Sequence, residues 1–151
     1  MNVQRFHATL EKVGTKTVLP IPFDPDEVWG SKPRHHITGT VNGRKVRGAL
    51  LADGDRFFLS LGAAWRRDSG LDAGDAVEVE LAPEGPQFAD LAPDIAAALD
   101  ASPAARAFFE GLATFYRKGY LRWINGARRP ETRASRIDEM IGLLEAGKNQ
   151  R

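Results

Sequence analysis

The residues best suited to binding chemistry lie in one stretch of the sequence, between positions 116 and 136. They combine aromatic rings with cationic side chains: Tyr116, Arg117, Lys118, Tyr120, Arg122, Trp123, Arg128, Arg129, Arg133 and Arg136. Glu131 is the one acidic residue among them. Guanidinium groups suit phosphates and carboxylates, and aromatic rings can stack on a base. The stretch therefore predicts an anion-binding site, with nucleic acid favoured over a small anionic ligand.

A purely structural role also fits these residues. Helical spacing would place Tyr116, Tyr120 and Trp123 on one side of a helix, where they could form a core contact. The arginines could then pair with acidic residues elsewhere in the chain, or extend along apolar surface with their charged ends in water. Both interpretations remain open on the sequence alone.

The three histidines, His7, His35 and His36, do not indicate a metal site. Adjacent residues on a strand point to opposite faces, so His35 and His36 could not easily share an ion. No HExxH or equivalent spacing occurs. We expect exposed or hydrogen-bonded histidines and no bound metal.

Motifs for catalysis are also weak. Asp24, Asp26 and Glu27 cluster, but the start of a helix favours the same residue types without any general acid–base role. Ser60 and Ser69 lack the Gly-x-Ser-x-Gly setting of a serine nucleophile. Neither a GxGxxG nor a P-loop pattern is present. We therefore expect no catalytic residues and no cofactor, and a non-enzymatic protein is favoured.

The formal net charge of +1 over 151 residues hides an asymmetry. Residues 1–112 hold 12 Lys/Arg and 16 Asp/Glu, a net of −4, whereas residues 113–151 hold 9 and 4, a net of +5. A basic tail on an acidic body indicates either docking within the chain or an anionic partner. The chain has no cysteine, no apolar signal segment and no membrane-length apolar run, so we expect a cytoplasmic protein without a membrane partner. We also expect a monomer or weak homo-oligomer.

Alternation of hydrophobic and polar residues predicts strands in the N-terminal part. Asn42-Gly43 lies between two alternating runs and is typical of a tight hairpin turn. Glycines at 39 and 48 fall on the apolar face, which indicates a close approach of backbones. The order strand, short helix, strand occurs in residues 16–41 and again in residues 56–81. This repetition predicts two equivalent halves of one small barrel with six or seven strands.

The pattern becomes helical after a stretch rich in proline. Residues 82–93 carry three prolines and a glycine, which predicts a linker. We expect a barrel domain over 1–82, a linker over 83–92 and a helical tail over 93–151. Helix starts are predicted at Pro93, at Ser102-Pro103, at Thr114 as a cap and at Pro130, giving three to four helices.

Two stretches resemble known families. The first combines FHATLEKVGTKTVLPIPFDPDEVWG, VNGRKVRGAL and LGAAWRRDSGLDAGDAVEVEL, and it resembles a bacterial domain family of unknown function with a small barrel fold. The second, ARAFFEGLATFYRKGYLRWINGARRPETRASRIDEMIGLL, is similar to the bacteriocin-protection (YdeI or OmpD-associated) helical family. Together they cover nearly the whole chain, in the tandem order in which the two families often occur. Neither resemblance implies catalytic residues.

A looser resemblance connects the R-x-x-x-G-L-x-x-G-D-x-V-x-V pattern to the AbrB/MazE swapped-hairpin barrel. It implies an AbrB-like double-split β-barrel in an α+β protein. The favoured function is a non-enzymatic binding or stress-protection module whose basic and aromatic tail contacts an anionic partner. One alternative is a structural or protein–protein adaptor with the tail docked on the barrel. The other is a small-ligand or enzyme site in the cleft between barrel and helices.

Overall fold

The computed structural model describes residues 3–151, which form two compact units. The first, the β-sheet unit, extends to Ser31 and continues over His35–Pro83. The second, the helical unit, contains Lys32–Arg34 and Glu84–Arg151. The α+β class predicted from the sequence is confirmed, because strands fill the first unit and helices follow in the second.

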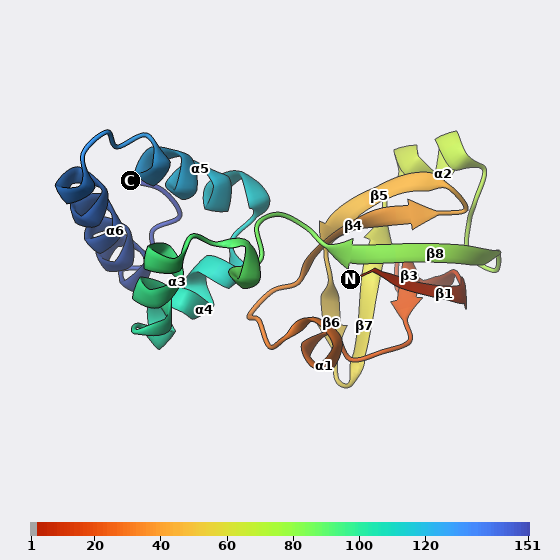
Figure 1. Cartoon of the computed structure of the whole chain (residues 1–151). Coiled ribbons are helices and arrows are strands. Elements are labelled where there is room, and N and C mark those ends of the chain that lie inside the picture. Colours follow the sequence, from red (N-terminus) through yellow and green to blue (C-terminus); the bar gives the residue numbers. More distant parts are fainter. Residues whose placement is uncertain (1–2) are drawn as a thin grey trace. The chain divides into compact units, whose positions relative to one another are not determined.

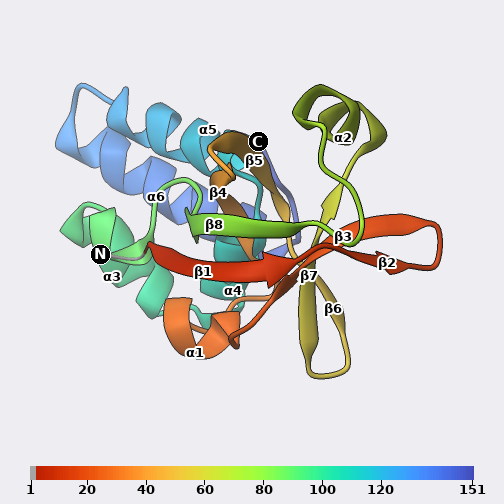
Figure 2. The ribbon, with the colours of Figure 1, turned by 90° about the vertical axis from the view of Figure 1, so that its right-hand side faces the viewer.

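The β-sheet unit holds, within residues 3–151, two antiparallel sheets of four strands each (Figures 1 and 2). The order in one sheet is β1-β8-β4-β5, with bounds Gln4–Thr9, Ala76–Pro83, His36–Val41 and Arg44–Ala49. The order in the other is β2-β3-β7-β6, with bounds Glu11–Val13, Lys16–Ile21, Arg56–Leu61 and Leu51–Asp53. Two short helices connect strands, α1 (Pro25–Trp29) before β4 and α2 (Ala63–Ser69) before β8.

The unit consists of two halves with the same element order: three strands, a short helix and a fourth strand. Equivalent strands begin forty residues apart, as Gln4 and Arg44 or Lys16 and Arg56 show. The pairing follows the same rule, because Leu19 pairs with its own equivalent Leu59 in the other half. Thr40 and Glu80 are paired in the same way. An approximate twofold axis therefore passes through both sheets, which confirms the prediction of two equivalent halves.

The number of strands among the described residues exceeds the predicted six or seven, because two long strands cross from one sheet to the other. Leu10 separates β1 from β2, and its N–H donates to the carbonyl of Asp75 at 2.9 Å. Leu50 separates β5 from β6, and its N–H donates to the carbonyl of His35, also at 2.9 Å. No strand ladder joins the two sheets within residues 3–151, so closure into an AbrB-like barrel stays a prediction.

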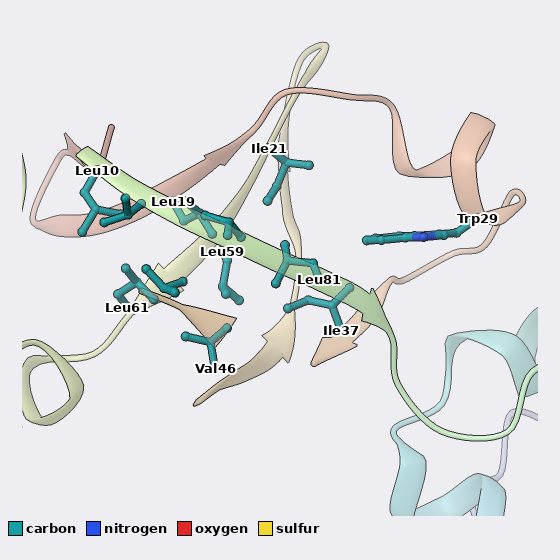
Figure 3. Close-up of a cluster of buried hydrophobic side chains, with 12 residues drawn as sticks. Leu10, Leu19, Ile21, Trp29, Ile37, Val46, Leu59, Leu61 and Leu81 are labelled. Atoms are coloured by element: carbon teal, nitrogen blue, oxygen red, sulfur yellow. The ribbon is translucent and has the colours of Figure 1, made fainter. Parts of the chain in front are cut away.

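Buried hydrophobic side chains from both sheets form the core of this unit (Figure 3). Burying each such side chain stabilises the fold by roughly 1.5–3 kcal/mol. Trp29 extends the cluster from α1, where Phe23 packs edge-on against its ring with a centroid distance of 5.2 Å. The cluster comprises Leu10, Leu19, Ile21, Trp29, Ile37, Val41, Val46, Leu59, Leu61, Val77, Val79 and Leu81.

The helical unit contains the four longest helices of the described chain: α3 (Pro93–Asp100), α4 (Pro103–Gly111), α5 (Thr114–Asn125) and α6 (Pro130–Glu145). A short 3₁₀ turn, η1 (Phe88–Asp90), precedes them. Proline is the first residue of α3, α4 and α6, where its missing N–H costs no helical bond. The predicted starts at Pro93, Pro103 and Pro130 are therefore confirmed.

The predicted cap of α5 is wrong. Ser102 caps α4 as expected, since its side-chain oxygen accepts from the N–H of Ala105 at 3.4 Å. Thr114 instead is the first residue of α5, and its hydroxyl donates to a carboxylate oxygen of Glu84 at 2.7 Å. The capping position belongs to Ala113, which has no side-chain oxygen. The Thr114 hydroxyl therefore binds the carboxylate of Glu84, thirty residues earlier in the sequence, and does not cap the helix.

One apolar face of each helix packs into a second core. Isolated helices of this length are marginal in water, so this shared burial stabilises them. Phe109, Leu99, Ile124 and Met140 are among its fully buried members, one from each helix. The full cluster comprises Ile95, Leu99, Ala105, Phe109, Leu112, Tyr120, Ile124, Ile137, Met140 and Leu144.

Candidate anion-binding surface on the helical unit

The basic and aromatic residues predicted from the sequence lie on α5, on the loop after it and on the first turns of α6. The structure separates them into two groups. One group is engaged inside the helical unit, and the other is exposed to solvent.

Arg117 belongs to the engaged group, with 3% of its surface exposed. Its two terminal nitrogens donate to the backbone carbonyls of Pro86 and Glu84, at 2.8 and 2.7 Å. Its Nε is buried without a hydrogen-bond partner. Burial lowers the pKa of this guanidinium, while the nearby charges of Glu84 and Glu110 partly oppose that shift. Arg117 therefore anchors the segment before α3 rather than offering a surface charge.

Arg133 and Arg136 are engaged as well. Arg133 forms a two-point ion pair with Asp94, at 2.6 and 3.0 Å, and donates to the side-chain oxygen of Asn125 at 2.8 Å. Arg136 donates to the backbone carbonyl of Trp123 at 2.7 Å. These contacts tie α6 to α3 and to the end of α5. Among the predicted site residues, these two arginines thus serve the packing of helices.

The pair between Asp94 and Arg133 gives a pH prediction. Hydrogen bonding to Arg133 is the largest cause that holds the pKa of Asp94 below its ordinary value of 3.8. The folded pKa is lower than the unfolded one, so the stabilisation is complete above pH 3.8 and is lost as pH falls through the folded value. Because the ion pair is partly exposed to solvent, we expect it to contribute only ~0.5 kcal/mol to the free energy of unfolding.

Comparing urea unfolding of the wild type with Asp94→Asn at pH 7 and pH 3 tests this contribution. The stability difference should shrink at the lower pH. An undiminished difference at pH 3 would show that Asp94 stabilises α3 by some means other than its charge.

The exposed group consists of four cations: Lys118, Arg122, Arg128 and Arg129. Within the described part of the chain, their side chains form no hydrogen bond or ion pair. Lys118 and Arg122 are one helical turn apart, so they lie on the same face of α5. Arg128 and Arg129 follow in the loop before α6. These four residues are called the exposed cations below.

A pocket of about 280 Å³ opens on the neighbouring face of α5. Its lining includes four aromatic residues, Phe115, Tyr116, Tyr120 and Trp123. The other lining residues are Gly119, Gln150 and Arg151. Tyr120 is 2% exposed, and its hydroxyl donates to the carbonyl of Lys148 at 2.6 Å, so it forms a fixed wall. Phe115 is 70% exposed. This pocket is called the α5 pocket below.

The sequence interpretation included three of the lining residues, Tyr116, Tyr120 and Trp123, and missed the other four, Phe115, Gly119, Gln150 and Arg151. A signal for Phe115 exists, because it lies three and seven residues before Lys118 and Arg122 and so shares their helical face. No local pattern signals Arg151, whose guanidinium lies 4.7 Å from the centre of the Trp123 ring.

His35, Asp24 and Asp26 form contacts within the β-sheet unit. His35 is 6% exposed, and its Nε2 lies 2.6 Å from a carboxylate oxygen of Asp26. Asp24 caps α1 by accepting from the N–H of Asp26 at 2.9 Å, as the sequence predicted. No cluster of three His, Asp or Glu side chains suited to a metal ion occurs within residues 3–151.

The fold and this surface define a two-part chain, a β-sheet unit of two equivalent halves followed by a helical unit with a basic and aromatic face. A family model described as a domain of unknown function (DUF1905) matches residues 6–81. A second model, described as bacteriocin-protection, YdeI or OmpD-associated, matches residues 89–147. The chain belongs to the DUF1905 family and carries the bacteriocin-protection domain in tandem, as both resemblances indicated. No curated protein matches the chain.

Across residues 3–151, none of the helices combines the length and the apolar character needed to span a bilayer.

Proposed function

We propose that the protein is a non-enzymatic binding module whose helical unit contacts an anionic partner, with nucleic acid as the favoured class. The proposal rests on one observation: the exposed cations form no hydrogen bond or ion pair within the described chain, and they lie beside the exposed ring of Phe115. Lysine and arginine side chains without partners can contact phosphates without first breaking a contact inside the protein. A protective role would agree with the description of the second family, which names protection without a mechanism.

The charge of the region supports an anionic rather than a cationic partner. Residues 113–151 carry 9 Lys/Arg against 4 Asp/Glu. Of the acidic residues there, Asp138, Glu139 and Glu145 lie beyond the first two turns of α6. Only Glu131 lies close in sequence to the exposed cations. Such a local excess of positive charge raises the concentration of anions at the surface and speeds their association.

A protein–protein adaptor is the competing function, and Phe115 is the observation that favours it. An aromatic side chain with 70% of its surface in solvent can anchor a protein partner as well as a base. An adaptor of this kind would depend on Phe115 and would be almost insensitive to neutralisation of the exposed cations.

Neutralising Lys118 and Arg122 tests the proposal. The double variant Lys118→Gln/Arg122→Gln should bind a labelled 12-nucleotide single strand about tenfold more weakly than the wild type at low salt, because each lost phosphate contact costs roughly threefold. Fluorescence anisotropy measures the affinity. Both residues are exposed, so folding should be unaffected.

The matched control, Lys12→Gln/Arg67→Gln, neutralises two basic residues on the surface of the β-sheet unit instead. This control has the same net charge as the test variant, and its affinity should stay within about twofold of the wild type. Equal weakening in both double variants would mean that only total charge matters, and it would overturn the assignment of binding to the helical unit.

A further inference from the structure

We propose that the α5 pocket is a stacking site for one base of a single-stranded nucleic acid. Phe115 and Tyr116 would contact the ring, and neighbouring cations would contact the flanking phosphates. The inference rests on the proposed function and deepens it, because it names the class of partner and the residues that distinguish it.

Size supports a single ring system as the occupant. The α5 pocket measures about 280 Å³, just below the range of roughly 300–1,000 Å³ that drug-sized ligands fill. Gly119 lines it between the aromatic residues, and no atom lies within 4 Å of the position that a Cβ would take there. The lack of a side chain at position 119 leaves the space between the rings open.

The arrangement of the rings identifies the free stacking surface. Trp123 is already flanked by two guanidinium groups, Arg151 at 4.7 Å and Arg136 at 5.6 Å from its ring centre. Phe115 and Tyr116 meet edge to face, with centroids 5.3 Å apart. Phe115 lines the pocket and is 70% exposed, so most of its ring is accessible from solvent. Base stacking on such a ring contributes roughly 1–3 kcal/mol.

The charge around the pocket distinguishes between two kinds of ligand that bind aromatic rings, a nucleic-acid base and a quaternary ammonium group. A cluster of aromatic rings can also hold a quaternary ammonium group. Here Arg151 lines the pocket, and Lys118 and Arg122 lie on the adjoining face of α5. These cations would repel a cationic ligand and attract the phosphates next to a base. The surroundings therefore favour a nucleotide over an ammonium compound.

A single strand fits better than a duplex because a base must leave its stack to enter a pocket. In a duplex that step costs a few kcal/mol, whereas the bases of a single strand are already accessible. Aromatic platforms next to a cationic track are the usual means of binding single strands without strong sequence preference.

The test compares two 12-nucleotide strands of equal length and charge, oligothymidylate and a fully abasic strand, by fluorescence anisotropy at one low salt concentration. The wild type should bind the base-containing strand at least about fivefold more tightly, since stacking adds 1 kcal/mol or more. In Phe115→Ala the preference for the base-containing strand should become clearly smaller, because one of the two contacting rings is lost, while Phe115→Trp should restore it.

The outcomes separate this inference from the proposed function. Equal affinity for both strands in the wild type, with binding retained, would overturn base stacking and leave the electrostatic function standing. No binding of either strand would overturn both. A preference that stays undiminished in Phe115→Ala would overturn the assignment of the base to this pocket. Because Phe115 is exposed, its replacement is not expected to unfold the helical unit.

Discussion

Replacing Gly39 by alanine is expected to unfold the β-sheet unit. A Cβ atom at this position would lie 1.8 Å from the backbone oxygen of Glu80 and 2.8 Å from its carbonyl carbon. Both atoms belong to β8, which pairs with β4 near the centre of the sheet. Backbone cannot rotate away as a side chain can, so the two strands would have to separate. We expect a loss of about 4 kcal/mol or more, beyond the usual range for overpacking.

Urea unfolding followed by tryptophan fluorescence in a Trp123→Phe background, where Trp29 and Trp65 of this unit are the remaining tryptophans, measures the effect. The matched control is Gly62→Ala, because Gly62 has a φ of −69° and no atom within 4 Å of its hypothetical Cβ. Its cost should not exceed about 1 kcal/mol. Similar midpoints for the two variants would contradict the close approach of β4 and β8.

Replacing Arg117 by methionine is expected to destabilise the helical unit by about 3 kcal/mol. The change removes the donor of the Pro86 carbonyl and leaves the Glu84 carbonyl with the longer bond from the Gln87 amide, at 3.1 Å; a part-buried acceptor left unpaired costs roughly 1–3 kcal/mol. Removing a desolvated cation whose Nε has no hydrogen-bond partner regains part of this cost. Methionine has a similar length, so little empty space should add to the loss.

Two measurements report on this change. Chemical denaturation gives the stability of the helical unit, and hydrogen exchange over residues 84–90 shows whether the anchored segment loosens. Arg122→Met is the matched control, since it makes the same replacement on the exposed side of the same helix. If Arg117→Met were as stable as Arg122→Met, the anchoring role of Arg117 would be wrong.

Local signals predicted much of the fold because turn chemistry and helix caps act over a few residues. Asn42 and Gly43 both adopt positive φ, 49° and 78°, as the predicted hairpin turn requires. Gly39 was also placed correctly at a close approach, since a glycine on an apolar strand face often marks a point where another backbone comes near. The breaks at Leu10 and Leu50 were missed, because neither position carries the glycine or proline that usually marks a turn.

The candidate site could be predicted only in outline. The sequence singled out the basic and aromatic stretch, but it could not tell which of its arginines are engaged in contacts within the helical unit. The partners of Arg117 lie 31 and 33 residues away, and the partner of Arg133 lies 39 residues away. Such contacts follow from tertiary packing, which no local pattern encodes. For the same reason the prediction left out Phe115, which is exposed and lines the α5 pocket.

The most direct test of the central claim is the salt dependence of binding to a single-stranded oligonucleotide. If the four exposed cations each contact one phosphate, the logarithm of the association constant should fall with the logarithm of salt concentration with a slope of about −3. Anisotropy titrations of the wild-type chain from about 25 to about 200 mM salt would measure it. A slope near zero, or no binding at the lowest salt concentration, would contradict an anion-binding role for the helical unit.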